Sequence, residues 1–268
     1  MDDNAAQFTG SIPQHYDAGL GPVIFTHYAD VLAGLVADGS PVRILETAAG
    51  TGISSAAISV ANPDAELVVT DLNGPMLEFA RPKLPAGTRV ETADAQALPF
   101  DDGTFDTVAC QFGIMFLPDL AAAFREARRV LAPDGRFVFS VWDSHAKNRF
   151  AALTDGVITS HFPTDPPPFY RVPFSRAEVD PLRDLAQESG FGEVTVHVVP
   201  YDTTVPSWDG FADGLILGNP VSDQIRERGG DLDAVKRDTI AKLQAEYGPT
   251  PTTMSIQTLF YVAKAREL

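Results

Sequence analysis

Residues 43–55 read Arg-Ile-Leu-Glu-Thr-Ala-Ala-Gly-Thr-Gly-Ile-Ser-Ser, and this stretch decides the fold of the chain. It predicts a buried strand over 41–46, a tight turn of small residues over 47–52, and a helix that begins near Ile53. Glycines let a backbone come close to a ligand, and a helix N-terminus offers N–H groups that lack an intrahelical partner. A strand that ends on a carboxylate and turns on glycines into a helix therefore indicates a nucleotide-binding corner.

Strands and helices alternate outward from this stretch. Apolar residues recur at helical spacing over 22–37, which predicts an amphipathic helix before the first strand. Apolar runs bounded by turn signals predict further strands over 66–71, 88–92, 105–111, 136–142, 193–199 and 254–263. Further helices are predicted from Gly74, over 119–131 and over 180–190. The alternation through residue 142 predicts an α/β fold with a parallel sheet and helices on both faces.

Three segments depart from this alternation. Residues 1–20 are polar, and we predict that they are loosely structured. Residues 143–174 show no clear period and are interpreted as a connector or partial lid. Residues 201–252 separate the last two strands, and in them Ser207 can cap a short helix and Asp231 a longer one.

Composition narrows the class of protein. The 268 residues suit one large domain or a core with an insertion, and 44% of them are hydrophobic. No apolar run approaches the roughly 18 residues of a membrane span, and the acidic, polar N-terminus is not a signal peptide, so we expect a cytoplasmic protein. A single cysteine, Cys110, excludes an internal disulfide and a cysteine metal cluster, and no other spacing suggests a metal site. The net charge of -16 argues against a nucleic-acid partner.

Three acids stand where predicted strands end. Glu46 closes the first strand, Asp71 closes the second, and Asp94 follows the third. In an open parallel sheet the ligand lies beyond the carboxyl ends of the strands, where the strand order reverses. The three carboxylates should therefore share one rim, where Asp71 can accept both hydroxyls of a ribose. The pattern predicts an adenosine-containing ligand.

A nicotinamide cofactor is the main alternative at such a corner. Its fingerprint, Gly-x-Gly-x-x-Gly, ends on a third glycine that allows close packing of the helix. Here Gly50-Thr51-Gly52 is followed by Ile53-Ser54-Ser55, so that glycine is missing. The phosphate-binding loop that ends in Gly-Lys-Ser/Thr is also absent from the sequence, which disfavours ATP chemistry of that type.

Four motifs follow one another in a specific order between residues 40 and 142. They are Leu-Glu-Thr-Ala-Ala-Gly-Thr-Gly at 45–52, Thr-Asp-Leu-Asn at 70–73, Ala-Asp-Ala-Gln-Ala-Leu-Pro-Phe at 93–100, and Arg-Val-Leu-Ala-Pro-Asp-Gly-Arg at 129–136. The ordered set resembles the class I S-adenosylmethionine-dependent methyltransferases. Within that family it is most similar to the branch of the ubiquinone and menaquinone biosynthesis methyltransferases. The resemblance implies that S-adenosylmethionine is the cofactor.

The resemblance also implies roles at the adenosine end of the site. Asp71 would hold the ribose hydroxyls, and Leu72 would pack on the adenine. Asp94 would accept from the adenine amino group, with the Ala95 N–H beside it. Ala48 stands where the family usually has its first glycine, which is a departure from the motif.

Other roles are implied at the methionine and sulfonium end. The glycine turn would line the methionine and ribose part, while Gln111 and Phe112 would lie near the sulfonium. Tyr16 is a candidate for closing over the cofactor from the N-terminal segment. The complete set expected to bind the cofactor is Tyr16, Glu46, Thr47, Ala48, Gly50, Thr51, Gly52, Asp71, Leu72, Met76, Asp94, Ala95, Gln111 and Phe112.

The family fold implies a seven-stranded, Rossmann-like, mostly parallel sheet whose last strand is antiparallel. Because about fifty residues separate the sixth and seventh strands, where simple members have a hairpin, we expect a helical lid between them. The expected organisation is an N-terminal helical segment over 1–40 that covers the cofactor cleft, an α/β core over 41–200 and 253–268, and the lid over 201–252.

The expected activity is methyl transfer to a small, apolar or aromatic metabolite by in-line displacement. A general base is optional in such a reaction, and His15, Tyr16 and His145 are candidates among which the sequence does not choose. Aromatic residues of segments 143–174 and 201–252 are candidates either to line an acceptor pocket or to form ordinary lid core, namely Phe162, Phe169, Tyr170, Trp208 and Phe211. Two alternatives stay open: a nicotinamide-dependent oxidoreductase, and a non-methylating binding module or cyclase on the same scaffold. The protein is expected to be a monomer or homodimer.

Overall fold

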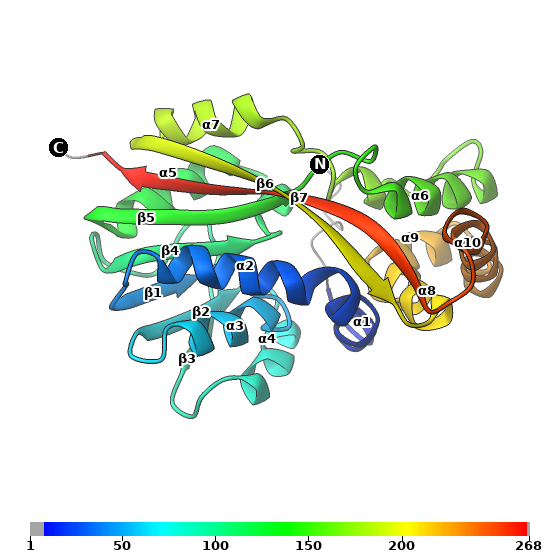
Figure 1. Ribbon diagram of the computed structural model, residues 1–268, viewed down its shortest axis with the longest axis horizontal. Helices are drawn as coiled ribbons and strands as arrows, with labels where there is room; N and C mark the ends of the chain where they lie inside the picture. The colour runs from blue at the N-terminus through cyan, green and yellow to red at the C-terminus, as the bar shows by residue number, and fades with distance from the viewer. Residues whose placement is uncertain (1–7, 267–268) are drawn as a thin grey trace.

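The computed structural model describes residues 8–266 and contains one open sheet of seven strands (Figure 1). The strand order is β3-β2-β1-β4-β5-β7-β6. β7 is antiparallel to β5 and β6, and the remaining neighbours are parallel. The strands are β1 (Arg43–Glu46), β2 (Glu66–Asp71), β3 (Arg89–Thr92), β4 (Phe105–Gln111), β5 (Leu131–Trp142), β6 (Phe191–Val205) and β7 (Thr252–Ala265). The predicted Rossmann-like sheet with an antiparallel last strand is confirmed.

Helices cover both faces of the sheet, as predicted. α2 (Thr26–Ala37) and α3 (Ile53–Ala61) lie on one face, and α5 (Leu120–Val130) and α7 (Val179–Glu188) lie on the other (Figure 1). Strands that are covered on both faces must be apolar along their whole length, which explains the continuous apolar runs in β1, β2 and β4. α4 (Gly74–Ala80) packs beside β2 and β3.

The strand order reverses at β1. The chain moves from β1 to β2 and β3 on one side, then returns to place β4 and β5 on the other side. The residue pairs Glu46–Val69 and Glu46–Ala109 mark the carboxyl end of β1 between its two neighbours. Loops that leave adjacent strands in opposite directions open a crevice at this point, which is where open α/β sheets bind ligands.

β6 and β7 are longer than the sequence predicted. They pair from Phe191–Ala265 to Val205–Thr252, whereas the predicted strands covered only 193–199 and 254–263. The additional residues of β6 alternate between exposed positions and positions that are buried or partly buried, so they lack the apolar run by which the other strands were identified. The two strands continue past the rest of the sheet as a ribbon that carries α8, α9 and α10 at its end (Figure 1).

Three helices occupy the segment between these strands. They are α8 (Trp208–Ile216), α9 (Val221–Glu227) and α10 (Leu232–Tyr247). Ser207 caps α8 by accepting from the Gly210 N–H, and Asp231 caps α10 by accepting from the Asp233 and Ala234 N–H groups, as predicted. The short helix α9 was not predicted. The division of the chain into core and lid stays a prediction.

The prediction of an aperiodic connector over 143–174 was wrong. This segment contains α6 (Arg149–His161) and a 3-10 turn, η4 (Phe169–Arg171). Phe150, Leu153, Val157 and Ile158 form the buried stripe of α6. Their spacing is helical, but polar residues and a glycine interrupt it. The helix is stabilised by packing against α10, a contact that a single-sequence pattern does not show.

The N-terminal helix begins earlier than predicted. It consists of α1 (Ile12–His15), a π-helical stretch η1 (Tyr16–Phe25) and α2, whereas the sequence predicted a helix only over 22–37. A π-helix has i→i+5 hydrogen bonds, so its apolar residues do not follow the usual helical period, and this explains the error. Residues 1–7 of the predicted loose segment lie outside the described residues.

This helix, Ile12–Ala37, is the one helix within residues 8–266 that is long and apolar enough to cross a membrane by length and composition. Core helices of soluble proteins pass the same test, and 56% of its most apolar window is buried against the rest of the protein.

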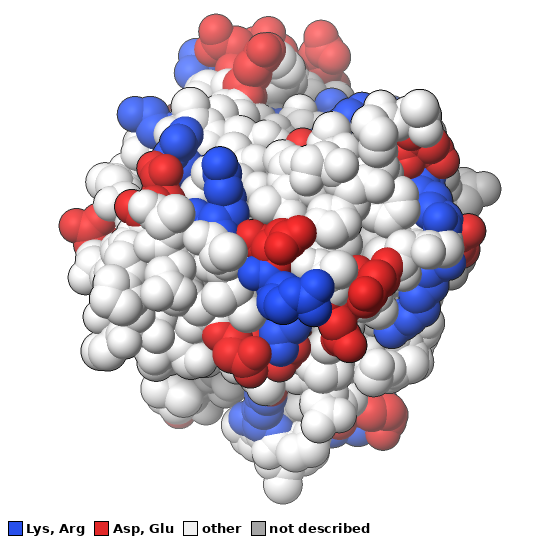
Figure 2. Space-filling view, turned by 90° about the vertical axis from the view of Figure 1, so that its right-hand side faces the viewer, with Lys and Arg blue, Asp and Glu red and all other residues white. Residues whose placement is uncertain are grey.

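We use the term cap for α1 and η1 together with residues 143–174 and 206–251. Figure 2 views the end of the molecule at which the cap helices lie, and there acidic and basic side chains lie close together. Ion pairs of this outer surface include Arg149–Glu246 and Lys236–Asp213.

Candidate cofactor site

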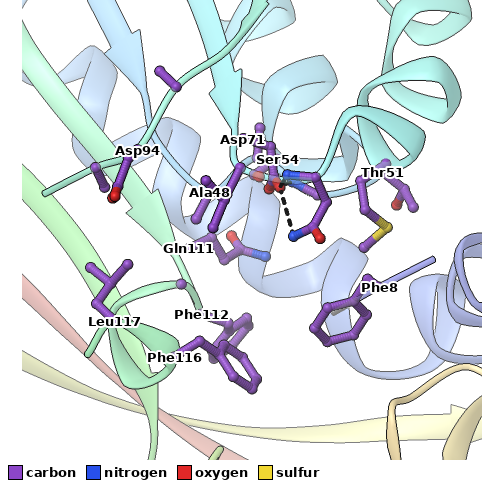
Figure 3. Close-up of a pocket in the computed structure, with 18 of the residues that line it drawn as sticks. Phe8, Ala48, Thr51, Ser54, Asp71, Asp94, Gln111, Phe112, Phe116 and Leu117 are labelled. Atoms are coloured by element: carbon purple, nitrogen blue, oxygen red, sulfur yellow. Dashed lines mark hydrogen bonds between the residues drawn. The ribbon is translucent and has the colours of Figure 1, made fainter. Parts of the chain in front are cut away.

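A cleft of about 580 Å³ opens at the carboxyl ends of β1, β2 and β4 (Figure 3). This volume is within the usual range for sites that bind small molecules and cofactors, roughly 300–1,000 Å³. Asp71 and Asp94 lie toward one end of the cleft, and the rings of Phe8, Phe112 and Phe116 lie toward the other. The predicted site residues that line it are Tyr16, Ala48, Gly50, Thr51, Asp71, Leu72, Met76, Asp94, Ala95, Gln111 and Phe112.

The glycine turn after β1 brings the main chain to the cleft. Gly50 and Gly52 have φ values of 57° and 78°, in the left-handed region that favours glycine. Ala48 also lies in this region, with φ 52°, at a cost of roughly 1–2 kcal/mol for a residue with a Cβ. The backbone of the turn is therefore left-handed at residue 48 although alanine stands there in place of the family's usual glycine. We call β1, this turn, α3 and Asp71 at the end of β2 the corner.

Asp71 connects the corner to β2. Its Oδ2 accepts from the Gly50 N–H at 2.8 Å, and its Oδ1 accepts from the Asn73 N–H at 2.7 Å. The side chain is 6% exposed, and this burial raises the pKa of the carboxyl while the backbone donors of Asn73 and Gly50 oppose the rise. The carboxylate thus fixes the shape of the glycine turn, and its remaining lone pairs can accept from a ligand.

Asp94 is held by the loop that follows β3. Its Oδ1 accepts from the Gln96 N–H at 2.8 Å and from Gln96 Nε2 at 3.0 Å. Gln96 in turn accepts from the Asp119 N–H at 2.7 Å, which ties the loop to the start of α5. The neighbouring residue Ala95 also lines the cleft. The loop therefore presents a carboxylate and main chain together on the rim.

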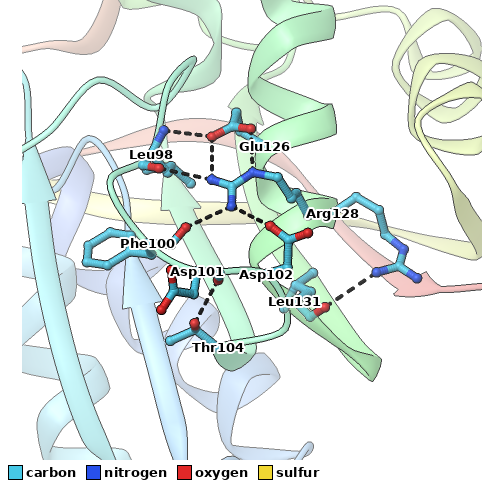
Figure 4. Close-up of polar contacts among 9 residues, drawn as sticks. Leu98, Phe100, Asp101, Asp102, Thr104, Glu126, Arg128 and Leu131 are labelled. Atoms are coloured by element: carbon cyan, nitrogen blue, oxygen red, sulfur yellow. Dashed lines mark hydrogen bonds and ion pairs between the residues drawn. The ribbon is translucent and has the colours of Figure 1, made fainter.

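Arg129 of α5 braces the other half of this loop (Figure 4). Its guanidinium donates to the carbonyl oxygens of Leu98 at 2.9 Å and Phe100 at 2.7 Å, and it forms a two-pronged ion pair with Glu126 at 2.7 and 2.8 Å. Glu126 Oε2 also accepts from the Leu98 N–H at 2.8 Å. The hydrogen bonds from Arg129 lower the pKa of Glu126. None of these four residues lines the cleft, so the network holds the loop from outside the cavity.

Three predicted site residues, Glu46, Thr47 and Gly52, do not line the cleft. Glu46 is buried behind the turn, where it accepts from the Ser54 hydroxyl, and burial raises its pKa to about 7. The Thr47 N–H donates to Ala109 O at 2.9 Å, within the sheet. Gly52 packs against α4, because a Cβ there would lie 2.6 Å from the Cβ of Ala80. In this structure these residues support the turn rather than facing the cavity.

The opposite end of the cleft is mainly aromatic. Tyr16 stacks on Phe25 with ring centroids 4.8 Å apart, and Phe25 contacts Phe112 at 5.7 Å. Burial, followed by the negative charge of Asp71, raises the pKa of the Tyr16 phenol, so this group stays a neutral hydrogen-bond donor. Gln111 also lines this end, and its Oε1 is buried without a partner among the described residues.

Phe8, Phe25 and Phe116 were not predicted as site residues. Phe25 lies two π-helical turns from Tyr16, and Phe116 follows Phe112 in the loop after β4. Tertiary contacts place them together, since Phe8 packs on Phe116 and Phe25 on Phe112, and the sequence does not show these contacts. A further contact joins the cap to the corner, since Lys83 of η2 (Arg81–Lys83) donates to Thr51 O at 2.8 Å and pairs with Asp17.

The candidate histidines lie outside the cleft lining. His145 Nε2 is 3.2 Å from the Tyr170 carbonyl oxygen, and its ring contacts Phe174. His15 precedes Tyr16 in the helix and also does not line the cleft. Of the three candidate bases only Tyr16 lines the cleft, and its raised pKa disfavours the phenolate that a base requires.

Comparison with known proteins gives consistent matches. Residues 45–139 match the family described as Methyltransferase domain. The chain is 41% identical over 122 residues to demethylmenaquinone methyltransferase of Thermus thermophilus, covering 44% of this chain and 56% of that protein. It is 30% identical over 171 residues to the ubiquinone/menaquinone biosynthesis C-methyltransferase of Pseudomonas aeruginosa, covering 58% of this chain and 67% of that enzyme.

The match to solved structures extends over nearly the whole chain. Phosphoethanolamine N-methyltransferase 2 of Haemonchus contortus, solved with S-adenosylhomocysteine, superposes with a TM-score of 0.59 over 98% of this chain and 60% of that one, at 15% identity. At this identity the likeness establishes the fold alone. By sequence, the chain spans about half the length of the first curated relatives that it matches.

Proposed function

This chain belongs to the class I S-adenosylmethionine-dependent methyltransferases, in the branch of the ubiquinone and menaquinone biosynthesis C-methyltransferases, and we propose that it transfers a methyl group to a small apolar or aromatic metabolite. The family membership confirms the prediction of S-adenosylmethionine as the cofactor. The observation that carries the proposal is the cleft itself, which gathers the glycine turn, Asp71 and Asp94 at the point where the strand order reverses.

The residues present fit an adenosine moiety. Asp71 and Asp94 offer carboxylate oxygens at one end of the cleft, for the ribose hydroxyls and the adenine amino group. Leu72 lines the cleft beside them and is 58% exposed, so its side chain is accessible to pack on the adenine. The left-handed turn at Gly50 lets the ligand approach the main chain closely.

The aromatic end fits the sulfonium part of the cofactor. The cofactor supplies a methyl group that is already activated by its positive sulfur. The faces of Tyr16, Phe25 and Phe112 can stabilise a cation by cation–π attraction, worth about 0.5–2 kcal/mol for each favourable contact. The orphaned Gln111 Oε1 can accept from a polarised donor at the same place.

The protein would contribute to methyl transfer mainly by orienting the acceptor and by excluding water from the reacting atoms. Holding a nucleophile in line with the methyl group can supply on the order of 7–11 kcal/mol of the barrier. The cap covers the aromatic end of the cleft from the side of η1, which keeps bulk water from the reacting atoms. The relatives named for demethylmenaquinone methylation support an acceptor that contains an aromatic ring.

Release of S-adenosylhomocysteine tests the proposal. The purified protein should bind S-adenosylhomocysteine in a calorimetric titration and should release it from S-adenosylmethionine when a suitable acceptor is supplied. Mass spectrometry of the acceptor should show a gain of one methylene. Absence of binding would refute the cofactor assignment, and NADH binding in its place would favour the oxidoreductase. Binding with conversion of a substrate but no release of S-adenosylhomocysteine would favour a cyclase.

A further inference from the structure

Ser54 stands between the cofactor cleft and a carboxyl group that is buried behind it. The residue belongs to the first turn of α3, two positions after Gly52, and is 6% exposed. It lines the cleft on one side (Figure 3), and on the other side its Oγ donates to Glu46 Oε1. The hydroxyl therefore connects Glu46, which does not line the cleft, with the space that a ligand would fill.

Glu46 lacks the partners that a buried carboxylate needs. The side chain is 0% exposed, and its Oε2 has no hydrogen-bond partner among the described residues. Buried carboxylates are normally paired with a cation or accept several hydrogen bonds. Within residues 8–266, no cation acts on this carboxyl. The site therefore holds the neutral acid more easily than the carboxylate.

The groups that face Glu46 come from three elements. Burial, above all, raises the pKa of Glu46 to about 7; the Ser54 and Ser55 hydroxyls of α3 oppose the rise, and the negative charge of Asp71 on β2 adds to it. Cys110 of β4 also faces Glu46, but burial raises the pKa of its thiol, which stays neutral. Glu46 is thus the group behind the turn that can gain or lose a proton near neutral pH.

The cleft in front of Ser54 has negative charges without a balancing cation. Asp71 and Asp94 line it, and its described lining residues include no Lys, Arg or His. Lys83 reaches the glycine turn from outside the cleft, where it donates to Thr51 O and pairs with Asp17. A cationic group that enters this part of the cleft would therefore meet acids and hydrogen-bond acceptors.

The hydroxyl of Ser54 can link such a cation to Glu46. A serine hydroxyl has one proton to donate and two lone pairs that accept. Because Ser54 donates to Glu46, its lone pairs are left for a donor in the cleft. A cation held there would favour the carboxylate of Glu46 over the acid and would lower the pKa of this group. By linkage, loss of the Glu46 proton must strengthen the binding of that cation by the same factor.

We propose that Glu46 is a proton switch for ligand binding: when an ammonium group binds at Ser54, Glu46 releases its proton to solvent, so that the ligand binds more tightly as the pH rises towards neutral. The step is balanced, because one proton passes from the Glu46 carboxyl to the solvent and no other covalent bond changes. The proposal rests on the proposed function, since the amino-acid end of the cofactor supplies the ammonium group. Ser54 would contact the ligand, and Glu46 would be a positioning residue that acts through Ser54.

Proton release, measured by calorimetry in buffers of different ionisation enthalpy, tests the switch. Since Glu46 titrates near pH 7 in the free protein, S-adenosylhomocysteine should release about 0.9 proton at pH 6 and about 0.5 at pH 7. Its affinity should rise about 10-fold from pH 6 to pH 8. 5′-Methylthioadenosine, which has the adenosine and the sulfur but no ammonium group, should bind without proton release and with the same affinity at both pH values.

Glu46→Gln keeps the size of the side chain but cannot ionise. S-adenosylhomocysteine should bind to this variant without proton release and with equal affinity at pH 6 and pH 8. Asp71 is present in both proteins, so its titration cannot produce the difference between them. Infrared difference spectra give a second, direct measurement. The C=O band of a protonated carboxyl should disappear when S-adenosylhomocysteine binds to the wild type at pH 6, and Glu46→Gln should not show this change.

Ser54→Ala and Ser55→Ala form a matched pair of variants. Both hydroxyls act on Glu46 from α3, but only Ser54 lines the cleft. At pH 8, Ser54→Ala should weaken S-adenosylhomocysteine binding about 5- to 10-fold, the effect of about one hydrogen bond, without changing that of 5′-methylthioadenosine. Ser55→Ala should change neither affinity.

The two ligands keep this proposal separate from the cofactor assignment. Binding of S-adenosylhomocysteine to the wild type without proton release, or equal release in Glu46→Gln, would overturn the switch and leave the methyl-donor assignment in place. If neither S-adenosylhomocysteine nor 5′-methylthioadenosine binds at any pH, the methyl-donor assignment fails and the switch fails with it.

Discussion

The corner and the cap differ in how their polar groups are satisfied. In the corner, Asp71 accepts from the Gly50 and Asn73 N–H groups, so the cleft has its shape before a ligand arrives. In the cap, apolar and main-chain packing holds the segments together, since Gly19 of η1 lies directly against Gly214 of α8 and the neighbouring side chains are mainly aromatic. The difference teaches that the corner is organised by its own charge and hydrogen bonds, whereas the cap is organised by packing.

Asp71→Ala should have the largest effect, because it removes the central charge of the corner and leaves the cap intact. Two charge-assisted hydrogen bonds to a ligand, each worth about 2 kcal/mol, correspond to roughly a 1,000-fold loss of S-adenosylhomocysteine affinity. Calorimetry measures this loss.

Asp106→Ala is the matched control for this variant. Asp106 Oδ2 also accepts from two backbone N–H groups, those of Val42 and Arg43 at 2.8 Å each, but at the opposite end of β1. That substitution should lower stability without changing cofactor affinity. Equal affinity in Asp71→Ala and wild type would contradict the assigned role of the corner.

Glu46→Gln tests the protonation of the carboxyl that is buried behind the glycine turn. Burial raises the pKa of Glu46 to about 7 in the folded protein, whereas a solvent-exposed glutamate carboxyl has a pKa near 4.5. The folded state therefore binds more protons between these values, and wild-type stability should fall as pH rises across this window. Since one pKa unit corresponds to about 1.4 kcal/mol, the fall is roughly 3 kcal/mol.

Urea unfolding at pH 5 and pH 8 measures this fall. Glu46→Gln cannot ionise, so its stability should lose this pH dependence and should exceed that of wild type at pH 8. The same slope in both proteins would show that Glu46 is ionised in the folded state.

Gly214→Ala should damage the cap and leave the corner intact. The added Cβ would lie 2.8 Å from the Gly19 carbonyl carbon and from Leu20, so η1 and α8 must separate. Overpacking of this kind costs about 1–3 kcal/mol, so we expect urea unfolding to show a loss of stability of that size while S-adenosylhomocysteine affinity stays within about 2-fold. Gly34→Ala in α2, where a Cβ meets nothing within 4 Å, is the control and should lower neither stability nor affinity.

Lys83→Met tests the connection between the two regions and should have the smallest effect. The Lys83–Asp17 pair is about 30% exposed on each side, so it contributes about 0.2–1 kcal/mol. We expect S-adenosylhomocysteine affinity to fall by at most about 5-fold, and less at high salt. Lys264→Met, which removes an exposed pair with Glu193 far from the cleft, should have no effect on affinity. A larger loss that is independent of salt would show that Lys83 contacts the ligand.

The same contrast explains what the sequence could predict. The corner was predictable because its signals are local: acids at strand ends, glycines at left-handed positions, and helix starts next to them. The parallel part of the sheet and the caps at Ser207 and Asp231 followed from similarly local patterns, whereas the antiparallel last strand was implied by the resemblance to the family.

The cap was not predictable to the same degree because its structure depends on distant contacts. The π-helical stretch η1 hid the helical period, and α6 depends on packing against α10. The sequence predicted Trp142 only as the end of a strand, and nothing local placed it beside Asn219. Even within the corner the sequence was not sufficient for Glu46, because its position at the end of a strand did not reveal that it is buried behind the turn.

The central claim is that the corner binds the methyl donor, and a crystal structure of the protein with S-adenosylhomocysteine tests it most directly. The account predicts adenosine between Asp71 and Asp94, with sulfur toward Gln111 and Phe112. Electron density for the ligand anywhere other than this cleft would contradict it.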